Sequence, residues 1–400
     1  MMIESETSTG AAPAGTRPPA VLQVLPRLVT GGVERGTVEV AAALVAAGWK
    51  AVVASEGGPM VREIERAGAR HVELPLASKN PVTMRRNVDR LAHLIRREHI
   101  DIIHARSRAP AWSALGAARR TGCHFVTTFH NAYGDETWLK RRYNRVMAEG
   151  ERVIAISRFV AAHAMRVYGV PGEKLRIIER GVDFNRFDPE RVSAERVIRL
   201  AREWQLPDGV QVVMLPGRLT RWKGQLVLVE AMGRLERRDL RCLLVGAGDG
   251  RYRQQLLDTI ARRGLGGLFQ VIEDCRDMPA AYMLADVVVS ASTRPEGFGR
   301  VIAEAQAMGR PVIATDHGGA REILLDGETG WLVPPDDPDA LARALAGALA
   351  FAPEERLALA RRSIAHMRSH FTTEVMTTRT LAVYEEILFP AAAEGPVAAQ

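Results

Sequence analysis

The chain has 400 residues, of which 47% are apolar and 25% are charged. This length favours two domains, and the composition excludes a wholly disordered chain, a collagen-like chain and a small disulfide-stapled protein. The net charge of +7 comes from the first half, where residues 1–190 hold 28 Lys and Arg against 20 Asp and Glu, and such a half favours an anionic partner or serves only as a soluble surface.

The N-terminus and the cysteines bear on the location of the protein. Residues 1–19 are polar and rich in Pro, Gly and Ala, so they are expected to form a disordered tail and not a secretory signal. The apolar runs at 38–47 and 340–352 are shorter than the roughly 20 residues that a membrane helix needs. The three cysteines are far apart and form no CxxC pair, which favours a reducing compartment. The sequence therefore predicts a cytoplasmic protein.

Short apolar runs alternate with amphipathic stretches along the chain. Strands are expected first at 21–25, 51–54, 101–104, 125–130 and 152–156, with a helix between the first two that ends near residue 47. The pattern then restarts, with a helix at 224–237 and strands at 210–216, 241–245, 269–272, 287–290 and 311–315. Such alternation is typical of parallel sheets that helices cover on both faces. The fold predicted is α/β, with two doubly wound, Rossmann-like domains facing across a cleft.

The domain boundaries follow from this restart. The expected N-terminal domain covers 20–183, and the expected C-terminal domain covers 210–370. The stretch between them, 184–209, contains Asn185, Asp188, Pro189 and Pro207 and is expected to be a linker. An amphipathic segment at 371–390 closes the chain.

Loops that follow strands are where open α/β sheets bind ligands. After the first strand, Gly31 and Gly32 let the backbone approach a ligand at a helix N-terminus, which suits a phosphate; the alternative is a tight turn. In the sequence GRLTRWKG (217–224), Arg218 offers a fork of donors and Lys223 a point charge. Both suit a diphosphate, although a solvated basic loop explains them equally well.

A second pair of loops carries glycines and carboxylates. In PEGFG (295–299), Glu296 lies near a helix N-terminus, and Glu304 lies on that helix. Two carboxylates beside bare amides suit a polyhydroxylated ligand, while the alternative is an ordinary helix cap. The sequence GAGDG holds Gly246 and Gly248 but lacks the third glycine of GxGxxG, so it favours close approach to a nucleotide base, or a plain turn.

A possible metal motif is weak. Asp337-Pro338-Asp339 matches DxD, but it follows two prolines and precedes a helical run. We expect a loop and a helix cap there, and therefore no metal site.

These motifs, in their order and spacing, resemble those of glycosyltransferase family 4, a family of retaining enzymes with the two-domain GT-B fold. The Glu-x7-Glu element in PEGFGRVIAEAQAMGRPVIAT is the most specific part of the resemblance. GRLTRWKG, VGAGDG, the GGVE loop and the run from Arg180 to Asp183 support it over about residues 20–390. The family commonly has Asn where this chain has Arg180.

The resemblance implies a role for each site residue and for the end of the chain. The closing helix is expected to pack back on the N-terminal domain. The implied roles are as follows: Arg218 and Lys223 bind the donor diphosphate and stabilise the leaving nucleotide; Glu304 holds the ribose; Glu296, with the amides of Gly297, Phe298 and Gly299, contacts the donor sugar; Gly31 and Gly32 close on the phosphates and the acceptor; and His130 lies beside the sugar.

The activity implied is transfer of a sugar from a nucleotide diphosphate donor to a glycan or lipid-linked glycan, in synthesis of lipopolysaccharide or another cell-envelope polysaccharide. No metal or other cofactor and no nucleic acid is expected. The basic first half favours an anionic acceptor, or peripheral association with the inner face of the membrane. Two alternatives remain, a nucleotide-sugar epimerase of similar fold and a non-enzymatic, two-lobed sugar-binding protein.

Overall fold

The computed structural model describes residues 17–29, 31–134 and 136–390. These residues form two compact units, one of residues 17–105 and 109–125 and the other of residues 106–108 and 126–390. Most of the expected N-terminal tail, residues 1–16, lies outside the described part. Of its remaining residues, Arg17 forms an ion pair with Asp101.

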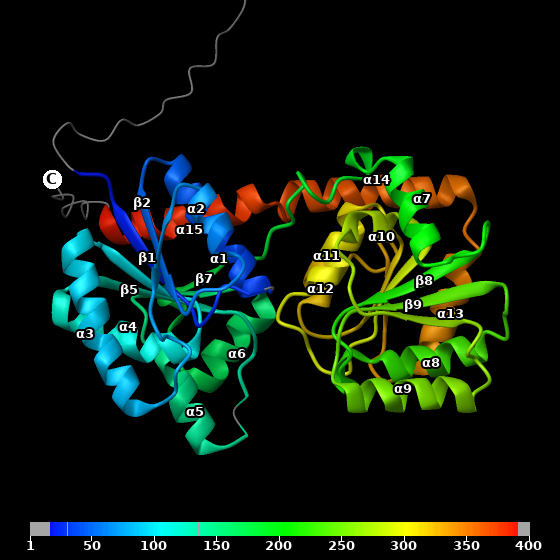
Figure 1. The fold of residues 1–400 in the computed structure, drawn as a ribbon, viewed down its shortest axis with the longest axis horizontal. Coiled ribbons are helices and arrows are strands. Elements are labelled where there is room, and N and C mark those ends of the chain that lie inside the picture. Colours follow the sequence, from blue (N-terminus) through cyan, green and yellow to red (C-terminus); the bar gives the residue numbers. More distant parts are fainter. Residues whose placement is uncertain (1–16, 30, 135, 391–400) are drawn as a thin grey trace, which may run out of the picture. The chain divides into compact units, whose positions relative to one another are not determined.

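The strands of the described residues form two parallel sheets, shown in Figure 1. The first has seven strands in the order β3-β2-β1-β4-β5-β6-β7, and the second has six in the order β10-β9-β8-β11-β12-β13. Both orders are those of a doubly wound Rossmann-like sheet, so the predicted fold class is confirmed. The strands are β1 (Ala20–Val24), β2 (Lys50–Ser55), β3 (Arg70–Glu73), β4 (Ile102–Ala105), β5 (His124–Phe129), β6 (Arg152–Ala155), β7 (Leu175–Ile177), β8 (Gln211–Pro216), β9 (Leu240–Val245), β10 (Phe269–Ile272), β11 (Val287–Ser290), β12 (Val312–Thr315) and β13 (Trp331–Val333).

Helices make most of the connections, because a parallel strand pair needs a long crossover. The helices are α1 (Gly32–Ala46), α2 (Val61–Arg66), α3 (Pro81–Glu98), α4 (Arg108–Thr121), α5 (Trp138–Asn144), α6 (Arg158–Tyr168), α7 (Ala194–Glu203), α8 (Gln225–Arg234), α9 (Gly250–Arg262), α10 (Met278–Leu284), α11 (Arg300–Ala307), α12 (Ala320–Ile323), α13 (Pro338–Leu349), α14 (Pro353–His370) and α15 (Thr373–Leu388). In α15, Glu386 pairs with Arg152 of β6 and Arg176 of β7.

The structure differs from the sequence-based expectations at several elements. Three strands were not predicted, β3, β7 and β13, and each is a short edge strand of its sheet. The helix expected at 224–237 ends at Arg234. The stretch expected to be a linker contains α7, whose first turn is capped by the side chain of Ser193, which accepts a hydrogen bond from Arg196 N.

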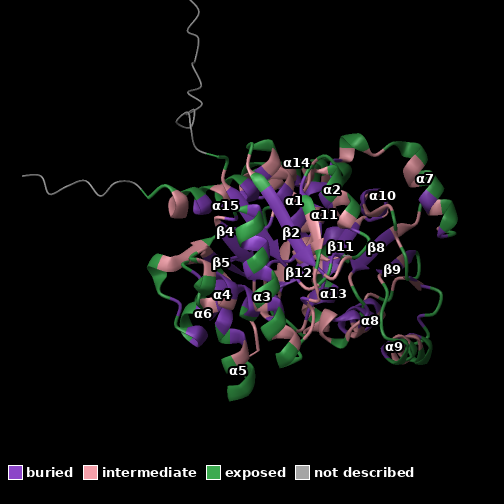
Figure 2. Cartoon of the chain, turned by 60° about the vertical axis from the view of Figure 1, so that its left-hand side comes forward, coloured by how far each residue is buried: buried purple, intermediate pink, exposed green. Residues whose placement is uncertain are grey.

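The central strands of each sheet are buried because they are apolar on both faces. All four residues of β11 and five of the six in β8 are buried. Figure 2 shows the same contrast, with β2 among the buried parts and α5 largely exposed. Full burial of one Val, Leu or Ile side chain contributes about 1.5–3 kcal/mol.

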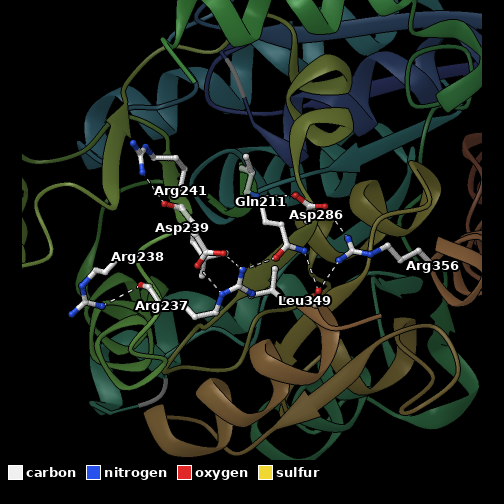
Figure 3. Close-up of polar contacts among 10 residues, drawn as sticks. Gln211, Arg237, Arg238, Asp239, Arg241, Asp286, Leu349 and Arg356 are labelled. Atoms are coloured by element: carbon white, nitrogen blue, oxygen red, sulfur yellow. Dashed lines mark hydrogen bonds and ion pairs between the residues drawn. The ribbon is translucent and has the colours of Figure 1, made fainter. Parts of the chain in front are cut away.

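A polar cluster ties together the amino-terminal ends of the strands in the second sheet (Figure 3). Asp286, which precedes β11, accepts hydrogen bonds from Val212 N of β8 and from the Arg356 guanidinium, both at 2.8 Å. Gln211 accepts a hydrogen bond from Arg237 at 3.0 Å through its side-chain oxygen. This edge of the sheet is opposite the edge at which the strands end and ligands bind. The cluster therefore stabilises the fold and is not part of a ligand site.

We expect Asp286→Ala to lower the free energy of unfolding by about 1–3 kcal/mol, because the buried amide of Val212 loses its acceptor. Urea denaturation measures this change. Asp239→Ala is the matched control from the same cluster: Asp239 pairs with Arg237, but its side chain is 68% exposed. The control should leave the free energy of unfolding nearly unchanged. Equal losses in the two variants would show that the amide acceptor is unimportant.

Candidate functional site

The loops that follow β8, β9 and β11 are bonded to one another at the carboxyl ends of these strands. The loop after β8 is bonded to the loop after β9, since Leu219 N donates to Ala247 O at 3.0 Å. It is also bonded to the loop after β11, since Thr293 N donates to Trp222 O at 2.7 Å. The strand ends therefore form one continuous loop surface, at the edge where α/β sheets bind ligands.

Gly246 and Gly248, two predicted donor-binding residues, lie in the loop after β9 against the loop after β8. A Cβ atom on Gly246 would lie 2.4 Å from Gly217 O, and one on Gly248 would lie 2.3 Å from Leu219 Cβ. Packing within the protein therefore already requires glycine at both positions. Their contact with a nucleotide stays a prediction.

Gly224 brings the key side chains of the site together. It follows a short helical turn, Arg221–Lys223, and its φ is +74°. A Cβ atom there would lie only 1.7 Å from Ala291 O, so only glycine allows the loops after β8 and β11 to meet. Their meeting places Lys223 Nζ 2.7 Å from Glu296 Oε1.

The Lys223–Glu296 ion pair is largely shielded from water. The Lys223 side chain is 14% exposed and that of Glu296 is 20% exposed. Ser292 Oγ donates to the same oxygen of Glu296, and Lys223 Nζ lies 4.6 Å from the centre of the Trp222 ring. An ammonium carries three donors, so Lys223 can bind an anionic ligand and Glu296 at once.

Arg218 lies in the same loop but does not join this ion pair. Its main-chain oxygen accepts a hydrogen bond from Gln225 Nε2 at 3.0 Å, and its side chain is exposed. Within residues 17–29, 31–134 and 136–390, no hydrogen bond or ion pair involves its guanidinium. All five donors of Arg218 are therefore open to a ligand.

The predicted amide donors lie between Glu296 and α11. Gly299 precedes α11 and has a φ of +114°, a conformation that favours glycine. Phe298 is buried, and its ring centre lies 6.0 Å from that of Phe371. Among the described residues, the amides of Gly297, Phe298 and Gly299 have no protein acceptor. Such amides at a helix N-terminus suit an anion or a hydroxyl group.

Two glycines that were not predicted from the sequence lie against the loop that contains Glu296. Gly319 N donates to Glu296 O at 2.9 Å. A Cβ atom on Gly318 would lie 2.5 Å from Glu296 O, and one on Gly319 would lie 2.4 Å from Phe298 O. Their signal in the sequence is the Gly-Gly pair shortly after a buried strand.

Glu304, on α11, is held by two side chains. Tyr282 of α10 donates to its Oε2 at 3.0 Å, and Arg300 donates to its Oε1 at 2.8 Å. Burial raises the pKa of the Tyr282 hydroxyl well above its usual range, and the Glu304 carboxylate raises it further. Tyr282 therefore stays a donor, and the Glu304 oxygens keep lone pairs for ligand hydroxyls. Sequence reasoning missed Tyr282.

His130 follows β5 directly, and not at the end of the strand as predicted. The main-chain oxygen of His130 packs closely against Gly297, in the loop after β11. A Cβ atom on Gly297 would lie only 2.9 Å from it. The Nδ1 atom of His130 lies 2.9 Å from a guanidinium nitrogen of Arg180, which is buried. This contact joins residues fifty positions apart and is invisible in the sequence.

Gly31 and Gly32 belong to the other compact unit. Gly32 begins α1, and a Cβ atom on Gly31 would lie 2.3 Å from a carboxylate oxygen of Glu34. The site residues after β5, β8, β9 and β11 therefore belong to one unit, and Gly31 and Gly32 belong to the other. Their contact with phosphates or acceptor stays a prediction.

The DxD match at residues 337–339 forms a helix cap, as predicted. Asp337 accepts a hydrogen bond from Ala340 N at 2.9 Å at the start of α13, and Asp339 pairs with Arg234. In the part of the chain that the structure describes, no three His, Cys, Asp or Glu side chains are grouped as metal ligands.

Two family models match the chain. Residues 30–186 match the model described as Glycosyltransferase Family 4, and residues 210–350 match that of Glycosyl transferases group 1. Together they include the loops described above and His130.

Named relatives are similar over most of the chain. A D-inositol 3-phosphate glycosyltransferase of Salinispora tropica is 31% identical over 94% of this chain and 82% of its own length. A GDP-mannose-dependent alpha-(1-6)-phosphatidylinositol monomannoside mannosyltransferase of Mycolicibacterium smegmatis is 30% identical over 65% of this chain and 70% of its own.

Solved structures share the fold. A glycosyltransferase of Rickettsia africae superposes with a TM-score of 0.87 at 36% identity, over 94% of this chain and all of that one. The Anabaena protein HepE in complex with UDP-glucose superposes with a TM-score of 0.81 at 22% identity, over 92% of this chain and 99% of its own.

Proposed function

The chain belongs to glycosyltransferase family 4, and from this premise we propose that it is a retaining enzyme that transfers a sugar from a nucleotide diphosphate donor to a phosphate-bearing glycan or lipid-linked glycan. The observation that carries the proposal is the Lys223–Glu296 ion pair, 2.7 Å long, beside three amides for which the described residues offer no acceptor. In this pair, Lys223 supplies a cation that can bind the leaving diphosphate. Glu296 supplies a carboxylate that can accept hydrogen bonds from sugar hydroxyls. The relatives are named as transferases, which favours transfer over the epimerase and sugar-binding alternatives.

In the proposed mechanism, Lys223 and Arg218 stabilise the charge that develops on the departing diphosphate. Donors already aimed at such a charge lower the barrier most where water is excluded. Glu304 accepts hydrogen bonds from the ribose hydroxyls, and Glu296 from the donor sugar. The proposed transfer takes place on one face of the sugar, without a covalent intermediate.

The enzyme is proposed to work without a metal ion or other cofactor. Lys223 and Arg218 take the place that a divalent cation would have at the diphosphate, since both offer several donors to phosphate oxygens. Activity that survives EDTA supports this proposal, and activity that EDTA abolishes and magnesium restores contradicts it.

The proposed acceptor carries an anionic group. Both relatives described above are named for acceptors that contain an inositol phosphate group. The net positive charge of residues 1–190 suits the same chemistry. A role in the synthesis of lipopolysaccharide or another cell-envelope polysaccharide is proposed as well, with an anionic, lipid-linked glycan as the acceptor.

Transfer of radiolabelled sugar tests the acceptor class. The full chain is incubated with labelled nucleotide sugars and with either inositol phosphate or a lipid extract containing lipid-linked glycans. Label in the lipid phase supports the lipid-linked acceptor, and label on inositol phosphate supports a soluble phosphate-bearing one. Transfer to neutral sugars alone would contradict an anionic acceptor.

A cytoplasmic location at the inner face of the membrane is proposed as well. Among the described residues, no helix has both the length and the apolar character needed to cross a bilayer. On α5, however, Trp138 is 69% exposed and Leu139 is 61% exposed. Exposed cations follow them directly, at Lys140, Arg141 and Arg142. An aromatic and aliphatic pair beside cations suits the surface of an anionic bilayer.

We expect the double variant Trp138→Glu/Leu139→Glu to bind vesicles of phosphatidylglycerol and phosphatidylcholine at least about tenfold more weakly, since each buried apolar side chain contributes about 1.5–3 kcal/mol. Cosedimentation at low and high salt measures binding. Leu357→Glu is the control, because Leu357 is also exposed (52%) but lies on α14. Equal binding by the double variant and the control would exclude α5 as the membrane contact.

A further inference from the structure

The contact between Arg180 and His130 defines which ring nitrogen of His130 carries the proton. A guanidinium nitrogen of Arg180 lies 2.9 Å from His130 Nδ1. Arginine has only donors and stays charged at any pH at which the protein is folded. Nδ1 must therefore accept, so the ring is neutral and its proton is on Nε2. A protonated ring would place a second cation against the guanidinium.

The backbone around Arg180 is fixed by the chain that leads into α15. Val182 N donates to Phe371 O at 2.8 Å, and Thr373 N donates to Val182 O at 3.1 Å. A Cβ atom on Gly181 would lie 2.4 Å from Thr372 O. Arg180 itself is 7% exposed. The backbone beside Arg180 is therefore held by the main-chain hydrogen bonds of Val182, and the Arg180 side chain is buried.

Other groups around His130 are consistent with a neutral ring. Its main-chain N–H donates to the Tyr133 hydroxyl at 3.4 Å, and burial raises the pKa of Tyr133, which stays protonated. The Arg108 guanidinium lies 4.5 Å from the centre of the Tyr133 ring. The loop with Glu296 also approaches His130 O, and the Glu296 carboxylate is paired with Lys223. The Arg180 guanidinium, 2.9 Å from Nδ1, opposes a positive charge on the imidazole.

We propose that Arg180 is a positioning residue that holds His130 as the Nε2–H tautomer, so that His130 donates a hydrogen bond to an oxygen of the donor substrate. The inference rests on the proposed function for the identity of that substrate. It assigns His130 the role of a neutral donor, and not that of a base or of a cationic partner of the diphosphate. The residue at position 180 thus acts on the sugar only through His130.

Nitrogen-15 NMR of the imidazole rings tests the tautomer in the full chain without substrate. His130→Asn identifies the His130 signals among those of the ten histidines. The expected result is a protonated Nε2 and an unprotonated Nδ1 from pH 6 to 8. In Arg180→Gln the ring should become a mixture of forms that protonates as the pH falls. In Arg180→Lys, which keeps a donor-only cation, the wild-type tautomer should remain.

Arg186→Gln is the matched control, because Arg186 is exposed and its guanidinium lies 5.1 Å from the centre of the adjacent Phe187 ring. Its His130 signals should equal those of the wild type. A proton on Nδ1, or a doubly protonated ring, in the wild-type protein would overturn the proposal. So would an unchanged tautomer in Arg180→Gln.

Kinetics then show whether the tautomer matters for the donor. With the nucleotide sugar that the enzyme turns over, Arg180→Gln should lower kcat/KM about tenfold, the scale of one hydrogen bond. In a His130→Ala background the same change should have no further effect. A further tenfold loss there would show that Arg180 acts on the substrate independently. Because the NMR result needs no substrate, failure of the proposed function would leave it intact, and the two failures can be told apart.

Discussion

Lys223→Ala should release nucleoside diphosphate from the nucleotide sugar about 100–1,000-fold more slowly than the wild type. This is the usual cost of removing one donor from a site where negative charge develops in the transition state. The side chain is 14% exposed and pairs with Glu296 at 2.7 Å, so its charge acts in a region with little water. Initial-rate assays of diphosphate release measure the effect. Lys223→Arg, which keeps the charge, should lose less.

The loss must be separated from an effect on stability. Ser292 still donates to Glu296 when the ammonium is gone, so the melting temperature of Lys223→Ala should fall only slightly. Arg221→Ala is the control, because Arg221 is an exposed cation of the same turn, with its guanidinium 5.9 Å from the centre of the Tyr252 ring. Near-wild-type turnover in Lys223→Ala, or an equal loss in Arg221→Ala, would contradict the assigned role.

Gly224→Ala should disrupt the site even more broadly. The new Cβ atom would lie 1.7 Å from Ala291 O, a separation that the backbone can relieve only by moving the loops after β8 and β11 apart. That movement would separate Lys223 from Glu296. We therefore expect both a large fall in the free energy of unfolding, measured by urea denaturation, and loss of turnover comparable to that of Lys223→Ala.

Gly209→Ala is the control for Gly224→Ala, because it has the same backbone strain but no clash with a neighbouring residue. Gly209 has a φ of +73°, almost the same as the +74° of Gly224, but a Cβ atom there would have no neighbour within 4 Å. Its cost should be only that of the left-handed conformation, about 1–2 kcal/mol. If Gly224→Ala were no worse than Gly209→Ala, the close approach of the two loops would not be essential.

The fold was predictable because local pattern and topology agree. Central strands such as β8 and β11 are continuous apolar runs, and their helices follow at the expected spacing. The edge strands β3, β7 and β13 escaped prediction because they are only three or four residues long, and β3 and β7 are also interrupted by charged residues. The helix α7 was hidden by the density of turn-forming residues in the stretch around it.

The site was predictable only where one segment carries the chemistry. Lys223, Glu296 and Glu304 stand out through the spacing of their own loops and helix. The contacts that hold them come from elsewhere in the chain: Tyr282 reaches Glu304 from α10, and Arg180 reaches His130 from the segment after β7. No periodicity encodes such pairs, since tertiary packing alone brings them together.

The central claim is that this loop surface binds a nucleoside diphosphate without a metal. The most direct measurement is a thermal-shift screen of the full chain with UDP, GDP, ADP, CMP and their sugar conjugates, with and without EDTA. A ligand that binds only the folded protein raises its melting temperature. We expect one nucleoside diphosphate to raise the melting temperature equally in both buffers, and a smaller rise in Lys223→Ala. No shift with any nucleotide, while the protein is folded, would contradict the claim.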